Sequence, residues 1–392
     1  MQPMKCKAER TTPQLLPVSG FDFIRFAMGV FTSAALFDHF FPREAATYHR
    51  IVRDHCSAQY AAYKNEPISR QSCQGVLECI LDHTSETHKA QLGTTSLILG
   101  LTPTILSWTG NGVFEMSLLS SQRPVLSVLL SVGAPVFSPT SLFPQWRPAE
   151  ILAGRPLAFK TPQAVKRHPF VLAVAQYVFA VGAIANLTHV AYIMSYMSVT
   201  LSSGCQNRYF VFLWIYVAVS AHICGWFAVH TRASWARSER HMSVDDGKRP
   251  ERSFLATLRR LAAIEISPCF AREPHVLKWK VETGLGLFLV NLTTVVVLGH
   301  VVWGTIILGS TTLVEPVDAV MLIGRFVAST VVCKAILMFE LAGMREVTTL
   351  EEEAVVVRTS SQGESSTALG KSATVASGSE ISPMLQRATR TV

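Results

Sequence analysis

Charged residues are scarce in this chain, and three long stretches have none. Only 16% of the 392 residues are Asp, Glu, Lys or Arg, against about 25% in typical soluble proteins. Residues 169–207, 209–231 and 283–314 contain no charged residue at all. A helix needs about 20 residues to cross the ~30 Å hydrocarbon core of a bilayer. Each stretch is long enough, so the sequence excludes an ordinary soluble protein and predicts a multi-pass membrane protein.

The sequence also lacks any catalytic, nucleotide-binding or metal-binding motif. His83 and His88 lie five residues apart with no cysteine pair nearby, which fits no zinc pattern, so we expect a solvated face there. The net charge of +8 comes from basic residues gathered in a few segments, and such segments set membrane orientation. The sequence therefore predicts no enzyme, no metal, no cofactor and no nucleic-acid partner; its predicted partner is the lipid bilayer.

The predicted fold is all-α, a polytopic helical bundle with about six membrane-embedded helices. Two of these are short apolar runs that Pro103 and Pro135 interrupt. Either both runs cross as tilted helices or one is re-entrant, because broken backbone at membrane depth survives only inside protein or facing water. The connection between them is short enough for a hairpin. The six predicted segments are 92–108, 124–139, 169–195, 209–231, 283–310 and 318–344.

The regions on either side of this domain, 92–344, are polar. Residues 1–47 contain one uncharged run of twelve residues, 26–37, which matches the core of a signal peptide or a short buried or interfacial helix. Residues 48–91 form a polar segment that contains cysteines. Residues 345–392 are rich in Ser and Thr and poor in apolar side chains, so we expect a disordered tail.

The positive-inside rule predicts the orientation of the last four segments. Residues 140–168 carry five basic residues and one acid, and residues 232–280 carry eleven basic residues and six acids. Both segments are therefore predicted to be cytoplasmic, with the loops at 196–208 and 311–317 outside and the C-terminal tail in the cytoplasm. The alternation does not say which membrane, plasma membrane or endomembrane, holds the protein.

The side of the first 91 residues depends on the two short runs. Two crossings would leave the N-terminus in the cytoplasm, and one net crossing would place it in the lumen. The lumenal version would put four cysteines in one oxidising compartment, where they could form two disulfides. The alternative is ordinary reduced thiols. The four cysteines are Cys56, Cys73, Cys79 and Cys205.

The last predicted span is unusual because it contains Arg325, Lys334 and Glu340. An ionisable side chain in the membrane costs about 2.5–3.5 kcal/mol on insertion scales, so each needs a reason to be there. Arg325 and Lys334 are nine residues apart and lie on opposite helix faces. Lys334 and Glu340 lie close enough to the cytoplasmic end to snorkel. Arg325 is the predicted buried charge, either as a substrate contact or as the partner of a neighbouring helix.

Other polar side chains lie inside the apolar spans. Three histidines on successive helices could converge to relay protons or bind a metal. The alternative is that these groups hold helices together, at about 0.6 kcal/mol each. The residues concerned are His189, His222, His300, Asn186 and Asn291. Ala221 and Gly225 form a small-xxx-small face suited to close helix packing.

One element of the cytoplasmic loop has a helical pattern. In residues 251–266, apolar residues including Leu255, Leu258 and Leu261 recur at helical spacing beside Arg259. We expect a basic amphipathic helix that lies on anionic lipid. The alternative is a helix that docks under the bundle.

The stretch from Gly100 to Pro139 resembles a family of uncharacterised multi-pass membrane proteins of filamentous fungi. It opens with Gly-Leu-Thr-Pro-Thr-Ile-Leu-Ser-Trp at 100–108. Residues 117–136 continue as Ser-Leu-Leu-Ser-Ser-Gln-Arg-Pro-Val-Leu-Ser-Val-Leu-Leu-Ser-Val-Gly-Ala-Pro-Val. The resemblance implies a Cys-bearing segment, an apolar hairpin with a polar-Arg-Pro step, and further spans. It implies no activity and no site residue.

Three function classes remain open, the third being an intramembrane enzyme, which would need convergent His or Asp groups in the spans. The first is a transporter-like, channel-like or sensory membrane protein, which the interrupted hairpin and Arg325 support. The second is a membrane scaffold or interaction protein, in which the polar groups inside the membrane only pack. A continuous polar cavity reaching Arg325 and His300 would favour transport. Local pairing of those two residues would favour a scaffold.

Overall fold

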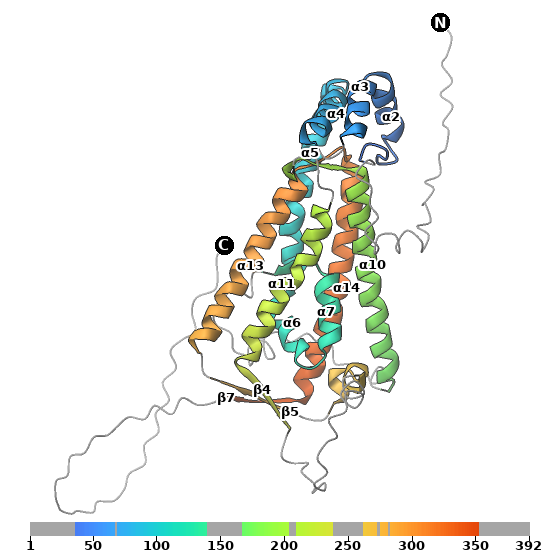
Figure 1. The fold of residues 1–392 in the computed structure, drawn as a ribbon. Coiled ribbons are helices and arrows are strands. Elements are labelled where there is room, and N and C mark those ends of the chain that lie inside the picture. Colours follow the sequence, from blue (N-terminus) through green and yellow to red (C-terminus); the bar gives the residue numbers. More distant parts are fainter. Residues whose placement is uncertain are drawn as a thin grey trace, which may run out of the picture. The chain divides into compact units, whose positions relative to one another are not determined.

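The computed structural model describes the chain between Leu36 and Glu352 with six gaps (Figure 1). The described residues are 36–66, 69–138, 167–203, 209–237, 262–272, 275–280 and 283–352. All belong to one compact unit, Met1–Glu353. Its longer helices are α2 (Ala45–Asp54), α3 (Ser57–Asn65), α4 (Arg70–Asp82), α5 (Glu86–Thr109), α6 (Val113–Ser120), α7 (Pro124–Gly133), α10 (Pro169–Met197), α11 (Phe210–His230), α13 (Gly284–Gly309) and α14 (Pro316–Val347).

Short strands join the helices in three places. The strands are β1 (Asn111–Gly112), β2 (Phe137–Ser138), β3 (Val199–Thr200), β4 (Ala233–Arg237), β5 (His275–Trp279), β6 (Thr311–Thr312) and β7 (Thr348–Glu352). They pair as β1-β2, β3-β6 and β4-β5-β7. Two 3-10 turns lie at Leu201–Ser203 and Cys269–Ala271. The prediction of a helical bundle is confirmed, and its all-α description must be corrected for these small sheets.

Among the described residues, four helices are long and apolar enough to cross a membrane, by length and composition: α10, α11, α13 and α14. They fall within a few residues of the predicted segments 169–195, 209–231, 283–310 and 318–344. Proline occupies the first turn of α10 and α14, where its missing N–H costs nothing. The predicted total of six spans is not established.

The two short predicted runs do not fold as two helices of the predicted length. The run at 92–108 is part of α5, a 24-residue helix that begins at Glu86 and continues through Pro103. The run at 124–139 is helical over only ten residues, in α7. The connection is not a simple loop, because it contains α6. After α7, the chain returns to the end of α5, where β2 pairs in parallel with β1.

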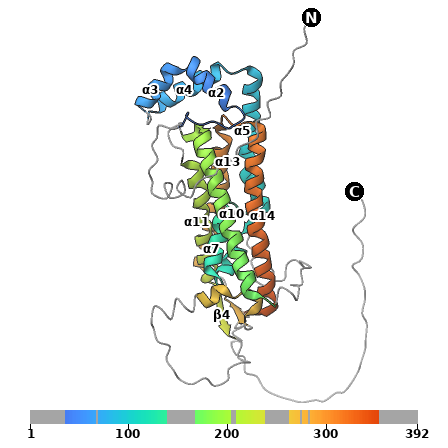
Figure 2. The same ribbon diagram turned by 90° about the vertical axis from the view of Figure 1, so that its right-hand side faces the viewer.

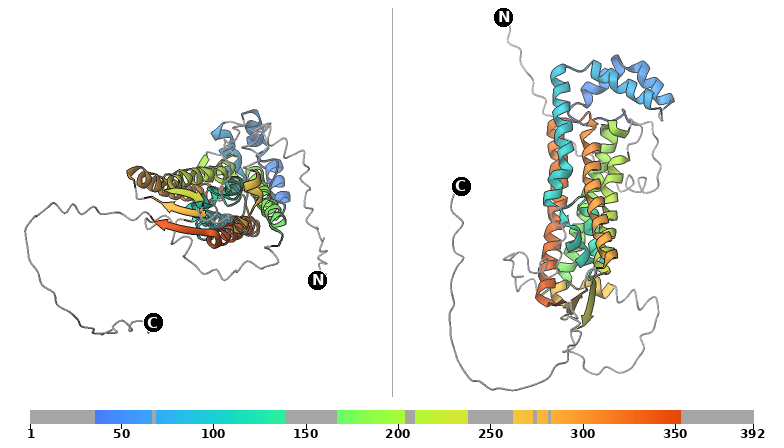
Figure 3. Two further views of the ribbon diagram at one scale, coloured as in Figure 1. Left: turned by 90° about the horizontal axis from the view of Figure 1, so that it is seen from below. Right: turned by 90° about the vertical axis from the view of Figure 1, so that its left-hand side faces the viewer.

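Helices α6 and α7 therefore form a helical hairpin that returns to the end of α5. Gly110 allows the return, because a Cβ there would lie 2.4 Å from the carbonyl oxygen of Val136. Figure 2 shows α7 between α10 and α11, and both helices contact it. In Figure 3 (right), α5 lies beside α13 and α14, which it also contacts.

The long helices alternate in direction, so their connections gather at two ends of this unit (Figure 1). Helices α2–α4 and the β3-β6 pair lie at one end, which we call the disulfide end. Strands β4, β5 and β7 form a sheet at the other, which we call the sheet end (Figure 3, left). Residues 345–352, predicted as disordered tail, continue α14 and form β7. The rest of the tail and most of the predicted 251–266 helix lie outside the described residues, although 262–266 are helical.

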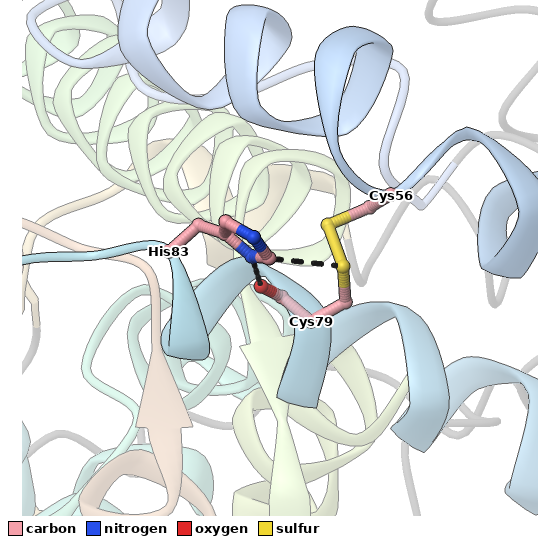
Figure 4. A group of neighbouring side chains, drawn as sticks. All are labelled: Cys56, Cys79 and His83. Atoms are coloured by element: carbon pink, nitrogen blue, oxygen red, sulfur yellow. Dashed lines mark hydrogen bonds between the residues drawn. A yellow bond between two sulfur atoms is a disulfide. The ribbon is translucent and has the colours of Figure 1, made fainter.

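The disulfide end has a core of its own. Apolar side chains from α2–α4 pack with Val199 and Leu313 from the loops of the bundle. Cys56 and Cys79 are joined by a disulfide, with His83 beside them (Figure 4). This disulfide joins the start of α3 to α4 and so fastens the three N-terminal helices to one another.

Large apolar side chains cover the outer faces of the long helices. Phe179 on α10, Phe288 on α13 and Met321 on α14 are each at least 60% exposed. Patches of this extent on a soluble monomer would be unusual. They match helices that face hydrocarbon.

Close helix contacts rely on small residues. Gly225 of α11 lies against α6, where a Cβ would approach Val113 Cγ1 to 2.3 Å and Ser117 Oγ to 2.8 Å. We expect Gly225→Val to destabilise the bundle by about 1–3 kcal/mol through overpacking. Gly182→Val on α10 is the matched control, because nothing lies within 4 Å of its Cβ position. Thermal unfolding in detergent measures both, and equal melting temperatures would contradict this packing.

The disulfides give a second prediction. Cys73 is also disulfide-bonded, and Cys205 lies outside the described residues. With Cys56 and Cys79 joined, the four-cysteine hypothesis leaves Cys73 and Cys205 as the second pair. Peptide mapping without reductant should recover both linked pairs. A free thiol at Cys205 would refute the pairing.

Candidate functional site

The charged groups of the bundle converge on the α6–α7 hairpin. Arg123 lies at the turn between α6 and α7 and is completely buried. Its Nη1 lies 2.9 Å from Glu340 Oε1 of α14 and donates to Gln176 Oε1 of α10 at 2.5 Å. Its Nη2 donates to the carbonyl oxygen of Glu265 at 2.7 Å. One guanidinium therefore joins the hairpin tip to three other segments of the chain.

Both carboxylate oxygens of Glu340 accept hydrogen bonds from protein groups. Gln176 Nε2 donates to Glu340 Oε1 at 2.5 Å, and the Cys269 N–H donates to Glu340 Oε2 at 3.0 Å. Its side chain is 1% exposed, so the prediction that Glu340 snorkels is wrong. Burial and the Glu340 carboxylate raise the pKa of the Cys269 thiol, which keeps it protonated.

The segment 262–272 closes this network from the sheet end. Glu265 Oε1 accepts from the Val125 N–H at 2.7 Å, which caps the first turn of α7. Glu265 Oε2 accepts from the Tyr177 hydroxyl at 2.5 Å. Arg272 donates to Gln122 Oε1 at 2.7 Å, and burial lowers its pKa. We call Arg123, Gln176, Glu265 and Glu340 the Arg123 network.

A second ion pair lies where α5 breaks and α6 begins. Lys334 Nζ of α14 donates to Glu115 Oε2 and to the Gly110 carbonyl oxygen, each at 3.2 Å. Glu115 also accepts from the Gly112 N–H at 3.3 Å and so caps α6. The predicted snorkelling of Lys334 is therefore replaced by pairing with the hairpin.

Asn111 completes this group. Its side chain is fully buried, and neither Oδ1 nor Nδ2 has a hydrogen-bond partner among the described residues. An unpaired buried amide costs about 1–3 kcal/mol, which singles it out in a bundle whose other polar groups are mostly bonded. We call Gly110, Asn111, Glu115 and Lys334 the hairpin site.

Arg325 lies elsewhere, on the α10–α14 contact. Its Nε donates to Asn186 Oδ1 at 2.8 Å, and its Nη2 lies 2.7 Å from His189 Nδ1. Asn186 Nδ2 in turn donates to Ser329 Oγ at 2.8 Å. The structure thus brings Arg325, Asn186 and His189 together as a local polar contact between two helices.

The three histidines of the spans do not converge. His222 Nε2 lies 3.3 Å from Ser127 Oγ of α7, while His300 Nε2 donates to the Trp214 carbonyl oxygen at 2.7 Å and its ring stacks on that indole. His189 is bonded to Arg325 instead. Asn291 is exposed on α13. The hypothesis of a shared proton relay or metal site formed by these histidines is wrong.

Two site residues that were not predicted, Glu115 and Arg123, can be recognised by their isolation in the sequence. Glu115 and Arg123 are the only charged residues between Lys89 and Arg147. Both lie in the connection between the two short apolar runs, and their isolation among apolar residues separates them from ordinary loop charges. Gln176 had no such signal, because a single amide in a 29-residue apolar helix is common.

No protein-family model, curated protein or solved structure matches this chain. The roles of the residues are therefore argued from their contacts. The resemblance to fungal membrane proteins stays a prediction.

Removing one partner of the buried Arg123–Glu340 ion pair should lower the stability of the protein. We expect Arg123→Met to destabilise the protein by about 3–5 kcal/mol, because Glu340 keeps its charge without its partner. The double variant Arg123→Met, Glu340→Met should regain most of the lost stability. Arg53→Met is the control, since Arg53 forms its ion pair with Asp54 on the surface. Unfolding in a denaturing detergent measures all four chains, and an unchanged midpoint for Arg123→Met would contradict the role of this pair.

Proposed function

We propose that this protein is a transporter or channel for small inorganic cations, with its binding site at the hairpin site. The sheet end faces the cytoplasm and the disulfide end faces the lumen or the cell exterior. The observation that carries the proposal is a charged, partly accessible site at the point where a membrane-depth helix is broken.

Broken helices have a specific use in membranes. Where a helix stops at depth, its carbonyl oxygens and the N–H groups of the next helix are freed to bind ions. Such backbone is stable only when it is buried in protein or lines water. The Gly110–Gly112 break, between α5 and α6, has this form.

Lys334 occupies the place where a free cation would bind. Its ammonium lies between the Gly110 carbonyl oxygen and Glu115 Oε2, at 3.2 Å from each. The unpaired Oδ1 of Asn111 adds a third oxygen at the same break. We regard the Lys334 ammonium as a tethered cation. It would leave the oxygens when a transported cation binds there, which keeps the charge of the site constant.

The solvent exposure of the hairpin site also supports cation binding there. The side chains of Glu115 and Lys334 are 33% and 27% exposed, whereas Arg123 and Glu340 are sealed. A charge pair exposed to hydrocarbon near the middle of α14 would be costly. A path for water to the hairpin site removes that cost.

A scaffold function is the second candidate, and specific contacts favour it. Arg325 and His300 pair only with neighbouring helices, which is the arrangement expected if the polar groups pack and nothing moves. Under this alternative, the hairpin would also be a static packing element.

Flux through proteoliposomes separates the two. The purified full chain, reconstituted with internal dyes for Na⁺, K⁺ and pH, is exposed to imposed Na⁺, K⁺ and proton gradients. We expect the wild type to carry at least one of these ions, and Glu115→Gln to reduce that flux at least tenfold by removing the charged ligand.

Arg325→Leu is the matched control, because it removes a membrane charge outside the hairpin site. It should retain most of the flux, with folding of each variant checked by size-exclusion chromatography. Absence of flux in the wild type, or equal flux in Glu115→Gln, would exclude cation transport at this site and leave the scaffold.

A further inference from the structure

Three side chains from distant parts of the sequence converge at the disulfide end. Glu44 precedes α2, His88 lies in the first turn of α5, and Glu315 precedes α14. One ligand atom from each lies within 4.8 Å of the others, and His88 Nδ1 is 3.9 Å from Glu315 Oε1. All three are half-buried, so the expectation of a solvated face at His88 is wrong.

Three acidic side chains lie together in and beside this cluster. Glu44 and Glu315 are close enough to hydrogen-bond, and Asp318 adds a third acidic group one turn into α14. The only arginine paired here is Arg43, 3.6 Å from Asp318 Oδ1. A cation bound between the carboxylates would offset their mutual repulsion.

Tyr48 orients the imidazole toward the carboxylates. Its hydroxyl lies 2.7 Å from His88 Nε2 and is itself buried. When a metal ion takes the lone pair of Nδ1, Nε2–H would donate to the phenol oxygen. An outer partner of this kind fixes the tautomer of histidines that bind metals.

We propose that Glu44, His88 and Glu315 bind a divalent transition-metal ion, with Zn²⁺ preferred. One imidazole nitrogen and two carboxylate oxygens suit Zn²⁺ better than Ca²⁺ or Mg²⁺, which favour oxygen alone. Ligand atoms around tetrahedral Zn²⁺ lie about 3.4 Å apart, so rotamer adjustments of about 1 Å close the site. The ion would fasten α2 to the starts of α5 and α14.

The neighbouring cluster of Cys56, Cys79 and His83 offers no such site. Its two sulfur atoms are bonded to each other, and His83 Nδ1 donates to the Cys79 carbonyl oxygen at 3.0 Å (Figure 4). His83 is therefore a matched control: it lies five residues from His88 and is not a proposed ligand.

The test is calorimetric titration of the tag-free, chelator-treated full chain in detergent with ZnCl₂. We expect a site of one Zn²⁺ per chain and a higher melting temperature with Zn²⁺, but not with equal Mg²⁺. Glu315→Gln should weaken Zn²⁺ binding at least tenfold. Tyr48→Phe, a positioning change, should weaken it about 10- to 100-fold, whereas His83→Ala should bind as the wild type does.

Each other outcome overturns the proposal. If the wild type binds no Zn²⁺, the carboxylates share a proton instead. If Glu315→Gln binds as tightly as the wild type, the metal lies elsewhere. The melting temperature without metal shows whether each variant is folded, and Glu44→Gln provides a second ligand test if Glu315→Gln is unstable. The proposal is independent of ion flux.

Discussion

The buried ion pair between Arg123 and Glu340 is the interaction on which the arrangement of this bundle depends. Both side chains are sealed from solvent, where either charge alone would be strongly destabilising. Gln176 and the Cys269 N–H fill the remaining hydrogen bonds of Glu340. Lipid supplies little driving force for one apolar helix to choose another. Because Arg123 and Glu340 can satisfy each other in only one arrangement, this ion pair can fix the position of the hairpin tip among the helices.

This constraint connects the hairpin to the placement of the two ends. After α7 the chain returns to the end of α5, where β2 pairs with β1, so the α6–α7 hairpin is enclosed between the longer helices. The disulfide-bonded N-terminal helices and the β4-β5-β7 sheet then lie at opposite ends of the unit. The proposed ion site and the proposed metal site lie in different parts of it, one at the helix break and one at the disulfide end.

The parts that could be predicted from the sequence are those that depend on local composition. The chargeless run at 169–195 became α10 with nearly the same bounds, because hydrocarbon length fixes the size of a span. The partners of Glu115 and Arg123 could not be predicted, because Lys334 and Glu340 lie more than 200 residues away in sequence. The prediction that Arg325 is the buried charge of its span is wrong, because Arg325 is half-buried and contacts Asn186 and His189, whereas Glu340 is sealed. The small sheets also depend on contacts between distant segments.

The most direct test of the account is which side of the membrane the hairpin tip faces. Ser121→Cys is placed at the exposed tip in a chain whose reactive native cysteines are replaced, and Ala58→Cys in α3 serves as the reference for the disulfide end. The two are labelled with an impermeant maleimide in sealed vesicles whose outer face is the side of the disulfide end. The account predicts that Ala58→Cys reacts at once and that Ser121→Cys reacts only after permeabilisation. Labelling of both positions from the same side would contradict a re-entrant hairpin held by Arg123 and Glu340.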